Sequence, residues 1–189
     1  MRRSAAVPVP PETNMENVEV DRFSLSRWLQ PDPTLAVFQK LSHLDGSVAA
    51  MTAEDWFEVW QHATIDSPVP VDIINLFEQA RACLAYGYFF YPLYALGIEQ
   101  LLRVADAALT VKCDALGASA KTFEKRIDWL AARGDRPSFD PAHWHGLRKF
   151  RNETSHHSRR MLLTPAAAMQ LLGDVAIEIE ALFTLEVAP

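Results

Sequence analysis

The segment from His143 to Arg160 concentrates side chains that can bind phosphate and exchange protons. It holds four of the six histidines of the chain and five basic residues against a single acid, Glu153. Because the chain has a net charge of −6, contact with nucleic acid would have to come from a local basic patch such as this one. The alternative is an ordinary solvated helix face. Beside Arg151, the candidate phosphate contacts are Arg148, Lys149, Arg159 and Arg160.

Three polar side chains of this segment share one face of a helix. Arg148, Asn152 and His156 recur at every fourth residue. Arg151 is displaced from His156 by about 140° on a straight helix that turns about 100° per residue. Arg151 and His156 would therefore converge only if the helix ends near His156, or if two copies of the helix meet.

These residue types fit RNA cleavage without a metal. In that reaction the ribose 2′-OH loses a proton, the 5′-oxygen gains one, and negative charge builds on the phosphoryl group. A histidine with a pKa of about 6.5 can exchange protons at cellular pH. An arginine offers a permanent forked donor to phosphate, and an asparagine can orient either group.

The motif Arg151-Asn152-x-x-x-His156 resembles the signature of HEPN domains, the helical nucleotide-binding and ribonuclease modules of toxins and CRISPR-associated nucleases. The stretch from Ala80 to Leu102 is similar to the first two helices of that family, where a glycine-aromatic corner precedes a helix with a glutamate, here Glu99. The resemblance covers about residues 70 to 185, with compatible helix order and lengths, and it leaves out the first 68 residues.

The resemblance implies an all-α, antiparallel four-helix-type bundle that forms a homodimer, so that two motif helices face each other and build a shared site. In catalytic members the residues that match Arg151 and His156 carry the cleavage, and the residue that matches Asn152 supports it. The implied role is that of a toxin or of a stress or defence ribonuclease, with RNA and an antitoxin or other protein as partners. Other members keep the bundle without activity. The alternative is therefore a non-catalytic interaction or nucleotide-binding module, whose Arg-Asn-His face is structural or a dimer contact.

Two further residues are candidates for a supporting role. By the resemblance, Glu99 is a partly buried acid that pairs with Arg151 or Arg148 and sets its orientation. The alternative for Glu99 is an exposed helix residue beside Arg103. His157 follows Glu153 by four residues, and the two form the only carboxylate–imidazole pair of the segment at that spacing.

Other chemistries have weaker signals. His143 and His145 do not share a helix face and have no cysteine nearby, so no metal site and no cofactor are predicted. The seven glycines are not clustered into a phosphate-binding loop. Ser155 and Ser158 lack a nearby acidic residue that could complete a hydrolase triad.

Five helices are predicted after residue 69, and no sustained β alternation or internal repeat occurs. Capping threonines or aspartate and first-turn prolines mark several of their starts, and Gly117 and Gly134 mark two of their ends. The pattern predicts an all-α fold. The helices are expected from about Val71 to Tyr86, Pro92 to Asp114 and Thr122 to Arg133, then after Asp140 through Trp144, Leu147 and Phe150, and finally after Thr164-Pro165.

Residues 1–68 are predicted to be a partly disordered tail plus a short helical extension, and residues 69–189 to be the bundle. The proline-rich break at 67–70 marks the boundary. Within the extension, Pro33-Thr34 predicts a helix through Leu41 that Gly46 closes, and Thr52 predicts the N-cap of a second helix. The tryptophans and phenylalanines of the extension are expected to pack onto the bundle.

Composition indicates a globular protein that is expected to be cytoplasmic and without a membrane partner. Hydrophobic residues make up 49% of the chain and charged residues 22%. The two cysteines, Cys83 and Cys113, lie in apolar helical pattern and are expected to be core residues in a reducing compartment. The N-terminus lacks the apolar segment of a secretory signal. The uncharged stretch from Ala82 to Ile98 includes two glycines, a proline and all four tyrosines, which favours a buried corner over a membrane-spanning helix.

Overall fold

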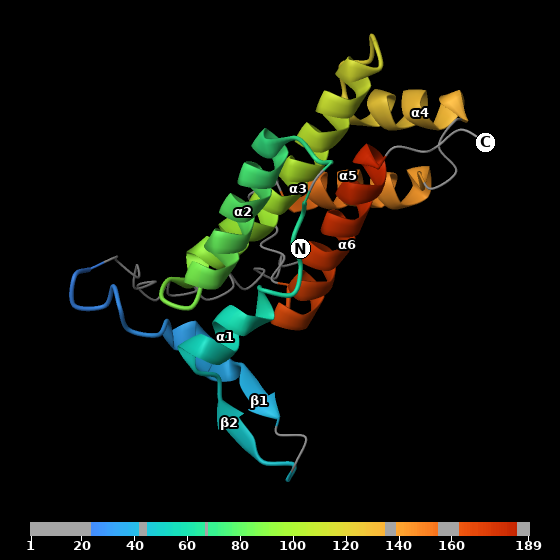
Figure 1. Ribbon diagram of the computed structural model, residues 1–189. Helices are drawn as coiled ribbons and strands as arrows, with labels where there is room; N and C mark the ends of the chain where they lie inside the picture. Colours follow the sequence, from blue (N-terminus) through green and yellow to red (C-terminus); the bar gives the residue numbers. More distant parts are fainter. Residues whose placement is uncertain (1–23, 42–44, 67, 135–138, 155–162, 185–189) are drawn as a thin grey trace, which may run out of the picture.

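The computed structural model describes residues 24–41, 45–66, 68–134, 139–154 and 163–184, and helix dominates these ranges, which confirms the all-α class. Helix α3 is central, because α2, α4, α5 and α6 all pack against it. Figure 1 shows α2, α3 and α6 running alongside one another, whereas α4 and α5 lie at a steep angle to them. The elements in chain order are η1 (a 3-10 helix, Pro33–Val37), β1 (Gln39–Leu41), β2 (Val48–Ala50), α1 (Ala53–Val59), α2 (Val71–Tyr86), α3 (Tyr91–Ala115), α4 (Phe123–Arg133), α5 (Pro141–Thr154) and α6 (Pro165–Phe183).

The helix termini follow the local signals of the sequence. The Thr122 side chain accepts a hydrogen bond from the backbone of Lys125 at the start of α4, and Gly134 ends that helix with a φ of 67°. Thr164 caps α6 in the same way, ahead of Pro165. These caps satisfy backbone groups that have no partner inside the helix, which is why the predicted boundaries are confirmed within a residue or two.

Helices α2 and α3 approach closely at two glycines. A Cβ atom at Gly97 would lie 2.8 Å from Cγ of Leu84 and 2.9 Å from the Leu84 backbone nitrogen. At Gly87 it would lie 2.7 Å from Cβ of Tyr94. Only glycine fits at these distances, so the predicted glycine-aromatic corner is confirmed as a tight turn between two core helices. The uncharged stretch is divided by this corner, and no helix in the described part of the chain is long and apolar enough to cross a membrane.

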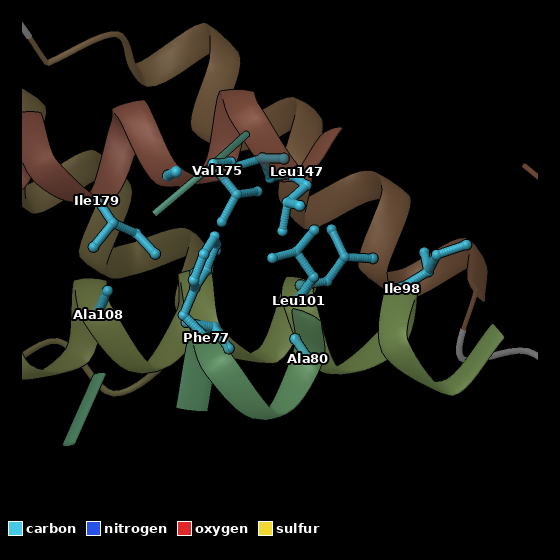
Figure 2. Packing of buried hydrophobic residues seen from close by; sticks show 14 of the residues in the cluster. Phe77, Ala80, Ile98, Leu101, Ala108, Leu147, Val175 and Ile179 are labelled. Carbon is cyan, nitrogen blue, oxygen red and sulfur yellow. The ribbon is translucent and has the colours of Figure 1, made fainter. Parts of the chain in front are cut away.

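One apolar core joins the helices. Figure 2 shows side chains of α2, α3, α5 and α6 pointing toward one another, and each of the labelled residues is at most 6% exposed. Cys113 is fully buried in α3, and burial raises the pKa of its thiol to about 11. The labelled residues are Phe77 and Ala80 of α2, Ile98, Leu101 and Ala108 of α3, Leu147 of α5, and Val175 and Ile179 of α6.

The first predicted helix of the extension is wrong beyond Val37. The 3-10 helix η1 ends there, and Gln39–Leu41 form strand β1, which pairs antiparallel with β2 so that Lys40 faces Ala49. Gly46, two residues before β2, has a φ of 70°. Helical spacing in so short a segment is a weak signal, and pairing with β2 overrides it. The second predicted helix is confirmed as α1, which Thr52 and Asp55 cap reciprocally.

The extension is attached to the α2–α3 corner by aromatic and polar contacts. Trp56 and Trp60 are at most 1% exposed, and the Trp56 indole donates a hydrogen bond to the carbonyl of Leu84 at 3.1 Å. The buried carboxylate of Asp32 accepts from the backbone of Tyr91 at 2.8 Å, at the start of α3. Packing is confirmed for Trp56 and Trp60, whereas the expectation is wrong for Trp28 and Phe57, which are 52% and 54% exposed. The domain boundary expected at the proline-rich break stays a prediction.

Candidate functional site

Helix α5 carries the predicted motif, and its apolar residues fix which face is open. The Asp140 carboxylate accepts a hydrogen bond from the backbone of Ala142 at 2.9 Å, where the helix begins. Trp144 and Leu147 are buried in the core. Lys149 and Asn152 are consequently exposed on the opposite side. The helix runs to Thr154.

The structure separates the predicted basic residues into two groups. Lys149 is exposed, whereas Arg148 lies against α4, where its Nη2 is 3.3 Å from Oε1 of Glu124. Arg151, in the last turn of α5, faces α3, with Nη2 3.3 Å from Oδ2 of Asp106. The remaining predicted residues, His156, His157, Arg159 and Arg160, lie outside the described ranges.

Asp106 connects three helices. Its Oδ2 faces Arg151 of α5, and its Oδ1 lies 3.9 Å from Nη1 of Arg126 of α4. The side chains are 22% exposed for Asp106, 13% for Arg126 and 36% for Arg151, so exposure rises toward the motif arginine. One carboxylate therefore lies between an inner and an outer guanidinium.

A hydrogen bond and an ion pair join α4 to α5. His145 Nε2 lies 3.2 Å from Oδ1 of Asp128, and the Arg148–Glu124 pair follows about one turn farther along α5. The second ring nitrogen of His145 is buried and has no hydrogen-bond partner within the described ranges. No group of three or more histidine, cysteine or acidic residues that could hold a metal occurs among the residues that the structure describes.

Glu99 has a different partner from the one expected. It lies 3.9 Å from Arg103, one turn along α3, and both side chains are more than a third exposed. Asp106 takes the place expected for Glu99 beside Arg151. The signal for Asp106 was available in the sequence, since it is the only charged residue between Val104 and Leu109. Arg126, whose partner is on another helix, carried no such signal.

A second polar cluster lies between α5 and α6. Burial raises the pKa of Glu178 on α6, and the nearby charge of His143 partly opposes this effect. Nε2 of His143 is buried without a hydrogen-bond partner in the described structure. Asp140 and Asp174 add negative charge around Glu178, which raises its pKa further.

The arrangement around Arg151 is suited to binding an anion. A guanidinium that contacts a carboxylate on one side and is still part exposed can donate to a phosphate oxygen in a preferred orientation. Proton transfer would come from His156, outside the described residues. Comparisons with known proteins found no relative: no protein-family model, no curated protein and no solved structure matches the chain.

Proposed function

We propose that the chain is a metal-independent endoribonuclease of the HEPN kind, which cleaves RNA at a site shared across a homodimer. The setting of Arg151 is the observation that carries this proposal. Its side chain is 36% exposed in the last turn of the motif helix, and Asp106 contacts it at 3.3 Å from α3. Exposed Asn152 is the next residue. A phosphate at this point meets a pre-oriented forked donor.

In the proposed reaction, the ribose 2′-oxygen attacks the adjacent phosphorus and the 5′-oxygen leaves. His156 exchanges the proton that the 2′-OH loses or the 5′-oxygen gains. Arg151 stabilises the charge that builds on the phosphoryl oxygens, and Asn152 supports it. The products are a 2′,3′-cyclic phosphate and a free 5′-hydroxyl. Lys149, exposed on the same helix, adds attraction for the RNA backbone.

An enzyme of this kind would act in the cytoplasm as a toxin or as a stress or defence nuclease. Its partners would be RNA and an antitoxin or other protein that holds it in check. The acidic net charge of −6 disfavours non-specific coating of nucleic acid, so cleavage would depend on the local patch of the motif helix.

Cleavage is tested with purified protein, unstructured RNA and a chelator. Arg151→Ala and His156→Ala are each expected to lower the cleavage rate by about 100-fold or more, because each removes a group that acts in the transition state. Thermal stability should change little. Arg103→Ala and His62→Ala are matched controls at exposed positions and should cleave normally. Equal cleavage by the motif variants and the controls would reject the proposed activity.

The shared site is tested at Gly146, on the exposed face of α5. Nothing lies within 4 Å of a Cβ atom placed there, so a larger side chain fits within one protomer. If two α5 helices face each other, Gly146→Gln should weaken dimerisation and cleavage together. Gly173→Gln in α6 is the matched control, because nothing lies within 4 Å of a Cβ atom placed there either. Dimerisation is measured by analytical ultracentrifugation, and identical behaviour of the two variants would exclude this face as the interface.

One observation favours a second candidate, a non-catalytic HEPN-like interaction or nucleotide-binding module. Both Arg148 and Arg151 pair with acids of neighbouring helices, Glu124 and Asp106, as structural side chains do. In that case the wild type does not cleave RNA, and Arg151→Ala lowers thermal stability or dimerisation instead. The cleavage assay and a thermal melt on the same samples therefore separate the two candidates.

A further inference from the structure

We propose that Asp106 is the positioning residue for Arg151 and that Arg126 holds Asp106 in place. The inference rests on the proposed function, because it concerns the orientation of Arg151 toward an RNA phosphate. The proposal gives residues of α3 and α4 a role in the site, although the motif that begins with Arg151 and Asn152 starts on α5.

The two carboxylate oxygens of Asp106 face different arginines. Oδ2 of Asp106 is 3.3 Å from Arg151, and Oδ1 is 3.9 Å from Arg126. Arg126 is the more buried of the two arginines, at 13% exposed against 36%. The carboxylate of Asp106 thus lies between the more buried arginine and the outer arginine, which still reaches solvent.

The same contacts are poorly suited to stabilising the fold. The Asp106 side chain is only 22% exposed, so its charge is partly removed from water, which costs free energy. Oδ1 of Asp106 and Nε of Arg126 are buried and have no hydrogen-bond partner within the described ranges. A partly buried ion pair with unsatisfied polar atoms adds little net stability. Fixing the direction of a working side chain is the role that this arrangement fits best.

A measurement without RNA tests the positioning itself. NMR of ¹⁵N-labelled arginine reports how fast the Arg151 guanidinium rotates about its Nε–Cζ bond. Asp106→Asn removes the charge at nearly constant volume and should speed this rotation several-fold. Asp114→Asn, an exposed position two turns along α3, is the matched control and should leave it unchanged. Unchanged rotation in the Asp106 variant overturns the positioning role.

A double-mutant cycle then connects positioning to function. Cleavage of RNA, and binding of a 2′-O-methyl oligonucleotide that cannot be cleaved, are measured for Asp106→Asn, Arg151→Ala and the double variant. Asp106→Asn is expected to lower cleavage by about 10- to 100-fold, because a misplaced group loses much of its effect. The double variant should match Arg151→Ala within about twofold, since Asp106 acts through Arg151. A purely structural Asp106 would instead multiply the two losses.

The failures are distinguishable. If the wild type binds the oligonucleotide without cleaving RNA, and the two single variants and the double variant bind it equally weakly, the catalytic proposal fails and the positioning role survives. If Arg151→Ala abolishes cleavage, and the loss in the double variant equals the product of the two single losses, the catalytic proposal survives and the positioning role fails. Thermal melts of all variants exclude loss of folding as the cause.

Discussion

The two sides of α3 are held by different interactions. Toward α2 the contact is apolar and very close, with Gly97 against Leu84 and fully buried Phe77 nearby in the core. Toward α4 and α5, apolar residues such as Trp144 are joined by charged contacts, of which Asp106 with Arg151 is the clearest. The helix is the same, yet one side is packed and the other is partly ionic.

The difference separates what stabilises the fold from what can recognise a ligand. Burial of a side chain such as Phe77 contributes about 1.5–3 kcal/mol, whereas an ion pair that reaches solvent contributes about 0–1 kcal/mol. The α2–α3 side is therefore expected to be sensitive to shape and insensitive to salt. The α4–α5 side has buried apolar residues as well, so its charged contacts should add a salt dependence that the α2–α3 side lacks.

The largest effect is expected where the extension meets the α2–α3 corner. Asp32→Ala removes a buried carboxylate that accepts from the backbone of Thr34 at 2.9 Å and of Tyr91 at 2.8 Å. Two backbone donors then lose a charged acceptor, which should lower the free energy of unfolding by about 3 kcal/mol. A melting temperature lower by about 6–12 °C would be measured by calorimetry.

Asp45→Ala is the matched control for this change. Asp45 also accepts from a nearby backbone nitrogen, that of Ser47 at 3.0 Å, but in an exposed turn. Its loss should alter stability by about 0.5 kcal/mol or less. Equal effects at Asp32 and Asp45 would mean that the extension contributes nothing to the corner.

The close approach of α2 and α3 is tested next by adding one methyl group. Gly97→Ala places a Cβ atom 2.9 Å from the backbone nitrogen of Leu84, which cannot move away easily. The two helices must separate, at a cost of about 1–3 kcal/mol. Gly173→Ala, with nothing within 4 Å, should instead stabilise by about 0.5–1 kcal/mol through helix propensity. The free energy of unfolding is measured by denaturant titration. If it changed in the same direction for both variants, the close approach of α2 and α3 at Gly97 would not be the cause.

Local signals made most of the fold predictable. Helix α2 has the predicted bounds, and Thr122, Gly134 and Thr164 end or begin helices as expected, because caps act within one turn of the chain. The β hairpin was missed. Its strands have three residues each, and contacts between distant residues, such as the Lys40–Asp55 ion pair, hold it against α1. Such contacts leave no periodic pattern in the sequence.

The candidate site was predictable on its own helix and not beyond it. Arg151, Asn152 and Lys149 were found because motif and charge are local features. The acid beside Arg151 was expected at Glu99 and lies instead at Asp106, seven residues later, which is two turns along α3. The helix and the face were right, but the register between α3 and α5 depends on core packing, which one sequence does not specify.

The ionic side of α3 is expected to respond weakly to mutation and strongly to salt. Glu124→Gln removes the partner of Arg148 and an acid from the first turn of α4. Glu124 is 55% exposed, so the loss should be at most about 1 kcal/mol and should shrink in 1 M salt. Asp72→Asn, in the first turn of α2, isolates the contribution of a first-turn acid. A loss of stability above about 2 kcal/mol that does not depend on salt would show that Glu124 stabilises the fold by packing and not through an exposed ion pair.

The smallest effect is expected at Glu178, between α5 and α6, and it depends on pH. Burial raises the pKa of this carboxyl above its ordinary value of 4.5 in the folded state, so folding favours its protonated form. The resulting stabilisation is fully present below pH 4.5 and is lost as the pH rises through the raised value. Glu178→Gln stays neutral throughout, so it should be slightly more stable than the wild type at pH 7 and equal to it at pH 4. Asp174→Asn removes a neighbouring charge and should give a weaker effect of the same sign. A gain in stability of Glu178→Gln that is the same at both pH values would show that ionisation of Glu178 is not its cause.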